Sequence, residues 1–210
     1  MCRLKFKFIV IVILSSTFVC FSQYFEGGII AGITASQIDG DTFAGYHQPG
    51  LTGGFFTTRK FTNILKGVIE LKYTAKGARE TGSKDDPILY SVKLRYVEMP
   101  VKANFIIEKY KIEIESGLGA GYLFYKEGDY NQSALNVPYR KFELSWIFGV
   151  NYKLSDYLKI ALQYNYSLLP VRKYNNVDYD YGFLSRTFWL TQGDYNNVVD
   201  LAIYYQFGKK

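Results

Sequence analysis

Residues 110–124 read YKIEIESGLGAGYLF, and in this stretch large apolar side chains alternate with charged or very small ones. One set of alternate positions holds Tyr110, Ile112, Ile114, Leu118, Ala120, Tyr122 and Phe124. The other holds Lys111, Glu113, Glu115, Gly117, Gly119 and Gly121. A period of two residues predicts a β-strand with one apolar face and one polar or open face.

The same alternation returns in residues 142–154 and 158–168, and in weaker form in about 25–34, 50–58, 65–75, 92–107 and 197–207. No sustained helical stripe follows Gln23. The 20 Tyr, 16 Phe and 19 Gly against 5 Pro also favour strands. The sequence therefore predicts one all-β domain of eight strands, and a length of 210 residues requires no second domain.

The first residues have the composition of a secretory signal peptide. Three bases and no acid in residues 1–7 precede the apolar run FIVIVIL at 8–14, which is too short to span a membrane. We expect cleavage after Ser22, so that residues 23–210 form the mature domain. Cleavage would remove Cys2 and Cys20, which excludes a disulfide scaffold and a cysteine nucleophile. It would also remove three positive charges, so the pI of about 9.1 is weak evidence for nucleic acid and we expect no such partner.

The connections alternate in length. Short links are expected near residues 59–63, 108–109 and 155–156, and long ones at about 36–48, 76–90, 125–140 and 170–196. Short turns at one end and long loops at the other are typical of an antiparallel up-and-down transmembrane β-barrel, with short periplasmic turns and long extracellular loops. The alternative is a soluble ligand-carrying barrel of the lipocalin kind.

The size of the apolar side chains decides between these alternatives. An eight-stranded barrel is just wide enough inside for side chains. The apolar rows hold Trp146, Phe148 and Tyr164, which are too bulky for that interior, whereas the polar rows hold glycines and charges of both signs. We therefore expect the rings to face lipid, with Tyr110, Tyr122, Tyr152 and Tyr166 in the interfacial girdles.

The polar rows predict a charge network in the lumen. Mixed signs favour a closed polar plug over an open pore, because unpaired buried charge is costly. The residues expected there are Glu70, Lys93, Arg95, Glu98, Lys111, Glu113, Glu115, Lys141 and Glu143, together with Lys66, Lys72, Lys102 and Lys159. In residues 92–105 the apolar parity changes, which predicts a β-bulge near Tyr96 and Val97. Pro100 cannot donate to the ladder, so we expect locally weak pairing there.

Three segments resemble the PorT-like family of small outer-membrane β-barrel proteins, which share the OmpA-type eight-stranded architecture. They are YVEMPV at 96–101, SGLGAGY at 116–122 and DLAIYYQF at 200–207, within a resemblance that covers about 25–207. The resemblance implies an outer-membrane location and recognition of the last strand, through Leu201, Ile203, Tyr205 and Phe207, by the barrel-assembly machinery. This chain departs by continuing through Gly208, Lys209 and Lys210. One family member is linked to protein secretion, and fold analogy alone would carry that role here.

Catalytic residues are sparse. His47 is the single histidine, and Ser36, Asp39 and Asp41 in the same expected loop could supply a nucleophile and an acid for lipid modification. No spacing fixes these side chains together, and a solvated surface histidine is the simpler interpretation. Scattered acids around one histidine make no metal site, and we expect no cofactor.

The last long connection is the candidate partner-binding loop, because it mixes rings with charges. Its main residues are Tyr174, Tyr179, Tyr181, Phe183, Arg186 and Trp189. Such a loop suits an envelope or secretion protein or a glycan, although its two ends could simply extend the strands. The prediction is a non-enzymatic barrel with a plugged lumen, in contact with outer-membrane lipids, whose loops bind a partner or support envelope integrity or secretion. The alternatives are a narrow channel and a lipid-modifying enzyme.

Overall fold

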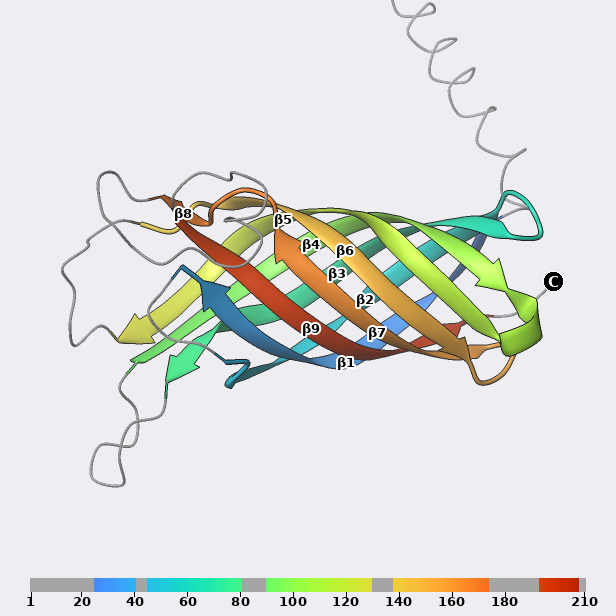
Figure 1. The fold of residues 1–210 in the computed structure, drawn as a ribbon, viewed down its shortest axis with the longest axis horizontal. Coiled ribbons are helices and arrows are strands. Elements are labelled where there is room, and N and C mark those ends of the chain that lie inside the picture. The colour runs from blue at the N-terminus through green and yellow to red at the C-terminus, as the bar shows by residue number, and fades with distance from the viewer. Residues whose placement is uncertain (1–24, 41–44, 81–89, 130–137, 174–192, 208–210) are drawn as a thin grey trace, which may run out of the picture.

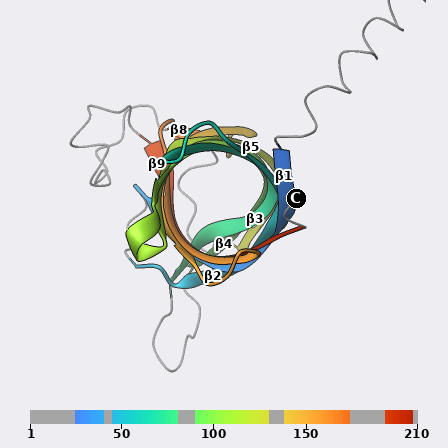
Figure 2. The same cartoon turned by 90° about the vertical axis from the view of Figure 1, so that its right-hand side faces the viewer.

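The computed structural model describes residues 25–40, 45–80, 90–129, 138–173 and 193–207, and these form a closed antiparallel β-barrel (Figures 1 and 2). The staves of the barrel are β1 (Phe25–Asp39), β2 (Gln48–Lys60), β3 (Leu65–Glu80), β4 (Tyr90–Ile107), β5 (Ile112–Asp129), β6 (Phe142–Lys153), β7 (Leu158–Ser167) and β9 (Gly193–Gln206). Each pairs with its neighbour, and β1 pairs with β9 to close the ring. The predicted eight-stranded fold is thus confirmed.

The two ends of the barrel differ. The connections β2–β3, β4–β5 and β6–β7 and both ends of the described chain lie at one end, called here the turn end (Figure 1). The β4–β5 connection is a single 3₁₀ turn, η2 (Glu108–Tyr110), followed by Lys111 with φ of 56°. The opposite end, called the loop end, carries the longer connections. Outer-membrane barrels place their short turns in the periplasm, which orients the chain.

Several strands extend farther toward the loop end than the sequence predicted. β1 continues to Asp39, β3 to Glu80 and β5 to Asp129, and β9 begins at Gly193. A further two-residue strand, β8 (Arg172–Lys173), pairs with β9 at its loop end. The hydrophobic alternation fades in these extensions, so it could not mark their ends.

The side chains alternate as the membrane orientation requires. In β6, Glu143, Ser145 and Asn151 are buried in the barrel, whereas Phe142 and Trp146 on the other face are 75% and 37% exposed. Exposed apolar side chains line the outer face of every long strand. A soluble barrel would show the opposite arrangement. In the described ranges, none of the helical segments has the length and apolar character of a membrane-crossing helix.

The irregularity near Tyr96 differs from the predicted bulge. Arg95 pairs with Tyr125 and Tyr96 with Leu123, so the extra residue, Phe124, lies on β5 and not on β4. β4 therefore keeps one parity throughout, and its Val92, Leu94 and Tyr96 are buried. The predicted change of face was wrong. The apolar parity of β4 changes because the surroundings of its two faces change along the strand, while each side chain keeps its side.

Pairing around Pro100 is interrupted, as expected. The register between β3 and β4 runs from Leu65–Phe105 to Ile69–Val101 and resumes at Lys72–Glu98. Because proline has no N–H to donate, the ladder loses a hydrogen bond at this point. The two strands nevertheless stay in register on both sides of the gap.

Closure of the barrel depends on a close approach of backbones at the β1–β9 seam. A Cβ atom added to Gly32 would lie 2.5 Å from the carbonyl oxygen of Leu201 and 2.7 Å from the Cα of Ala202. These neighbours are backbone atoms of β9 and cannot move without disturbing the ladder. Only glycine fits this position.

We predict that Gly32→Val prevents closure of the barrel. Unboiled samples of the purified variant should lose the heat-modifiable electrophoretic mobility that closed barrels show. Ala31→Val is the matched control, because Ala31 is the adjacent residue and its side chain is exposed on the outer face. Equal folded fractions for the two variants would contradict this explanation of the seam.

Candidate functional site

The barrel interior is filled by three tiers of buried ion pairs. In the tier nearest the turn end, the Glu113 carboxylate accepts hydrogen bonds from Lys66 and from the Asn104 amide at 3.2 Å. Lys159 reaches the same carboxylate from β7 at 3.4 Å. Strands β3, β5 and β7 are thus linked across the interior by one acid.

The middle tier is centred on Lys102. Its Nζ lies 2.6 Å from Glu70 and 3.0 Å from Glu115, on β3 and β5. The Tyr204 hydroxyl donates to Glu70 at 2.8 Å, and the Asn151 amide donates to Glu115 at 2.8 Å. Nearby, Lys72 pairs with Asp200 at 3.3 Å. These side chains are almost fully buried.

The third tier is centred on Lys76, which lies 2.5 Å from Glu98 and 3.0 Å from Glu143. The Thr74 hydroxyl donates to Glu98 at 2.7 Å, and the Ser167 hydroxyl to Glu143 at 2.6 Å. Lys76 has no exposed side-chain surface. Burying a lysine is costly, and two carboxylates with hydrogen bonds to their oxygens offset that cost.

Above the third tier, the interior becomes apolar. The loop-end cluster consists of Ile38, Ala78, Val92, Leu94, Tyr96, Leu123, Tyr139 and Val171, each at most 8% exposed. These residues come from β1, β3, β4, β5 and the segments before β6 and after β7. The cluster therefore lies across the loop end of the ion-pair network and separates it from that end.

The five acids expected in the lumen lie in the interior: Glu70, Glu98, Glu113, Glu115 and Glu143. Of the eight expected bases, Lys66, Lys72, Lys102 and Lys159 lie in the interior, and the other four do not. Lys93 is half-exposed and pairs with Glu127 at 3.5 Å, and Arg95 lies over the ring of Tyr125 at 4.5 Å. Both have the outward parity of β4, because that strand does not change face.

Lys111 and Lys141 lie outside the network for a different reason. Both are exposed and both precede their strands, since β5 begins at Ile112 and β6 at Phe142. The alternation of the sequence includes both lysines, but the strands of the barrel wall begin after them. The lysines that neutralise the acids are Lys66, Lys72, Lys76, Lys102 and Lys159.

Sequence reasoning missed three central members of the network. Lys76 falls in the long connection predicted at residues 76–90, although it shares the parity of Lys66, Glu70 and Lys72. Asp200 and Tyr204 lie in the terminal strand, where the sequence pattern predicts pairing of the strand but no role in the network. A further departure is Tyr166, expected in an interfacial girdle, which is buried and stacks on Tyr195 with ring centroids 6.0 Å apart.

The candidate catalytic side chains are not brought together. The Ser36 hydroxyl donates to the carbonyl oxygen of Gln48, and the exposed His47 ring lies 3.9 Å from Glu80 of β3. Asp39 accepts hydrogen bonds from Gln37 and Asn197, and Asp41 lies outside the described residues. Across the described ranges, no group of three or more His, Cys, Asp or Glu side chains could hold a metal ion.

The six residues of the candidate partner-binding loop lie outside the described residues, which resume at Gly193. The flanks of this loop belong to the barrel. Arg172 of β8 pairs with Asp194 of β9 at 2.7 Å, and the Val171 amide donates to the carbonyl of Asp194 at 2.7 Å. The two flanks of the loop, β8 and the start of β9, therefore continue the barrel wall past the loop end of β7.

Removing one member of the middle tier tests the network. We predict that Lys102→Met lowers the free energy of unfolding by about 3–5 kcal/mol, because Glu70 and Glu115 would lose their shared counter-ion. Equilibrium urea unfolding in lipid vesicles measures the change. Lys93→Met is the control, since its half-exposed pair should contribute at most about 1 kcal/mol. A loss of similar size in both variants would contradict the assignment.

The comparisons with known proteins agree with this architecture. The family model described as "Outer membrane protein beta-barrel domain" matches residues 21–172. Neisserial surface protein A is 11% identical, with a TM-score of 0.53 over 86% of this chain and 97% of that one. Ail of Yersinia pestis, solved with the heparin analogue sucrose octasulfate, is 14% identical, with a TM-score of 0.47 over 88% of this chain and 100% of that one. No curated protein matches the chain. The chain belongs to the outer membrane protein β-barrel domain family and is an outer-membrane protein.

Proposed function

We propose that the protein is a non-conducting, non-enzymatic barrel whose loop end binds a partner outside the membrane. The observation that carries the proposal is the occupied interior, with ion pairs along the barrel and the apolar loop-end cluster above them. Over the residues that the structure describes, an interior filled in this way would block a continuous water path for ions. In the described part of the interior, the hydroxyls of Thr74 and Ser167 contact carboxylates that are already paired with Lys76, which disfavours their use as general bases.

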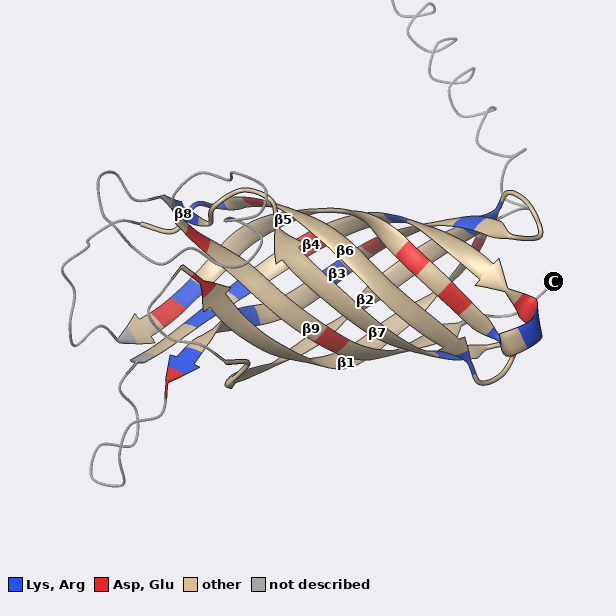
Figure 3. Cartoon of the chain, in the orientation of Figure 1, with Lys and Arg blue, Asp and Glu red and all other residues tan. Residues whose placement is uncertain are grey.

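The outer surface supports a role for the loop end. On β4 the exposed apolar side chains run from Val97 to Ile107, which matches the roughly 9–11 residues of a membrane-spanning strand. Beyond Val97 the outward residues are Arg95 and Lys93. Charged residues likewise occupy the loop ends of β3 and β5 (Figure 3). The barrel wall thus rises beyond the lipid as a polar rim, which would hold the loops away from the membrane.

Within the family, we place the chain with the PorT-like members because of the order of its three sequence segments. The partner would be an envelope or secretion protein or a glycan, and the barrel-assembly machinery would insert the chain after a signal peptide, residues 1–22, is removed. The alternatives are a narrow channel, which the interior disfavours, and a lipid-modifying enzyme, which would need His47 and Ser36 to meet.

Conductance measurements test the plugged lumen. The purified protein should give no ion-conducting steps in planar bilayers, because the loop-end cluster and the ion pairs leave no water path. Leu94→Ser and Tyr96→Ser together remove apolar bulk from the cluster and serve as the opened reference. Steady conductance from the wild-type barrel that changes in Glu113→Gln or Glu115→Gln would establish the channel alternative.

Loop shortening tests partner binding. Replacing residues 174–192 by a short glycine and serine linker keeps the Arg172–Asp194 pair, so the barrel should still fold. We predict that the protein or glycan co-purifying from native outer membranes falls severalfold, because the rings and charges of this loop would supply its contacts. A matched variant shortened at 81–89 is the control. Undiminished recovery after the first change would contradict the assignment.

A further inference from the structure

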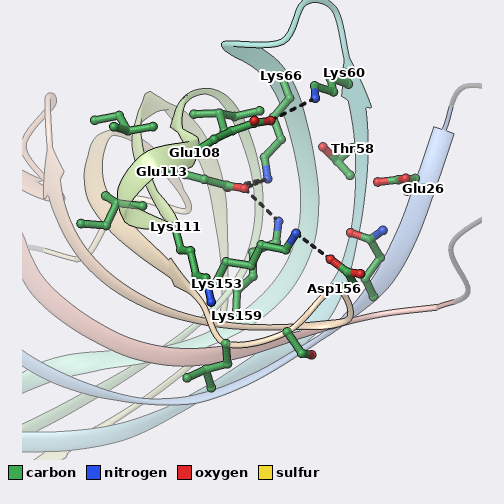
Figure 4. A pocket seen from close by; sticks show the side chains of 16 residues that line it. Glu26, Thr58, Lys60, Lys66, Glu108, Lys111, Glu113, Lys153, Asp156 and Lys159 are labelled. Atoms are coloured by element: carbon green, nitrogen blue, oxygen red, sulfur yellow. Dashed lines mark hydrogen bonds and ion pairs between the residues drawn. The ribbon is translucent and has the colours of Figure 1, made fainter.

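A cavity of about 650 Å³ opens at the turn end of the barrel (Figure 4). The turns and the adjoining strand ends form its walls, so it faces the periplasm. Its volume is within the range of small-molecule sites. It lies at the opposite end from the proposed partner-binding surface and has no part in the proposed function.

The charges at the mouth of this cavity compensate one another. Lys60 pairs with Glu108 at 3.7 Å, and Lys153 pairs with Asp156 at 2.7 Å. Both pairs are largely exposed, and Figure 4 shows each as a separate link near a turn. The mouth therefore contributes little net charge.

Deeper in the cavity the balance is different. Lys66 and Lys159 extend from different strands into the cavity, and both pair with the carboxylate of Glu113 (Figure 4). That carboxylate also accepts from the Asn104 amide. Among the described residues that line the cavity, these two ammonium groups share one acid, so one positive charge at this depth has no carboxylate of its own. The side chains are shielded from bulk water, at 8% exposed for Lys66 and 13% for Lys159.

A second observation points to the same place. Gln206 of β9 also lines the cavity, and although the residue is 5% exposed, its side-chain oxygen and nitrogen are not among the fully buried polar atoms that lack a partner, so the amide remains accessible from the cavity. Its backbone is fixed, because its N–H donates to the carbonyl oxygen of Tyr157 at 2.8 Å. The cavity thus offers an accessible amide as well as two lysines that share one acid.

The floor of the cavity limits how far a ligand can enter. A small adjoining void shares Lys66 and Lys159 with the cavity, and Glu70, Asn104 and Asn151 line it. Each of these three residues has a buried oxygen without a hydrogen-bond partner. Unpaired acceptors repel an anion, so a negative group would stop at the level of the two lysines.

We propose that the turn-end cavity binds a small oxyanion, a carboxylate or a phosphate, from the periplasm. The oxygens of the anion accept hydrogen bonds from Lys66, Lys159 and the Gln206 amide. Charge-assisted hydrogen bonds of this kind are among the stronger ones in proteins. The rest of the ligand occupies the outer volume toward the exposed pairs of the mouth.

Isothermal titration of the folded full-length protein in zwitterionic micelles tests the proposal, at an ionic strength held constant with sodium chloride. Inorganic phosphate and succinate are titrated separately. We expect saturable binding of at least one, and the arm that binds identifies the group. Lys159→Gln should weaken that binding roughly tenfold, while Glu113 keeps Lys66 as its partner and the barrel stays folded.

Two further variants keep the test decisive. Gln206→Leu retains every charge and should weaken binding severalfold, which a general electrostatic effect would not do. Lys109→Gln removes an exposed lysine that does not line the cavity and should leave binding unchanged. Absence of saturable binding for both anions, or equal binding by wild type and Lys159→Gln, would overturn the proposal.

Discussion

A closed eight-stranded barrel in lipid leaves one place for ionised side chains, its narrow interior, and there each charge must find a partner. Lys76 and Lys102 satisfy this constraint by each lying between two carboxylates from other strands. The pairs also connect strands that are not neighbours, since Lys72 of β3 reaches Asp200 of β9. The ion pairs therefore fill the space and hold the staves of the barrel together across it.

The chemistry of the two faces inverts where the strands leave the membrane. Within the lipid, β4 directs Met99 and Val101 outward and Glu98 and Lys102 inward. Beyond it, Lys93 and Arg95 are outward and Val92 and Leu94 inward. The strand keeps its alternation, but the outer surroundings change from lipid to water and the interior from polar to apolar. The apolar loop-end cluster closes the barrel on its outer side. The cavity at the turn end opens to the periplasm.

This inversion explains what could be predicted from the sequence. Period-two alternation and the lengths of the connections predict strand number, topology and lipid-facing residues, because these follow from local geometry. The interior position of Glu113 and Glu115 follows in the same way. The prediction for Lys93 and Arg95 is wrong because, in the sequence, a change in polarity along β4 resembles a change of face. The pairing of Lys76 with Glu143, far apart in the sequence, depends on closure of the ring, which alternation alone does not contain.

The most direct test of this orientation uses Trp146, which becomes the only tryptophan in a Trp189→Phe variant. Its side chain is exposed on the outer face of β6, at the level of the apolar band. The protein would be reconstituted into vesicles whose lipids carry bromine on their acyl chains. The account predicts strong quenching of Trp146 fluorescence relative to unbrominated lipid. Unchanged emission in brominated lipid, from a barrel shown to be folded, would place the ring inside and contradict the account.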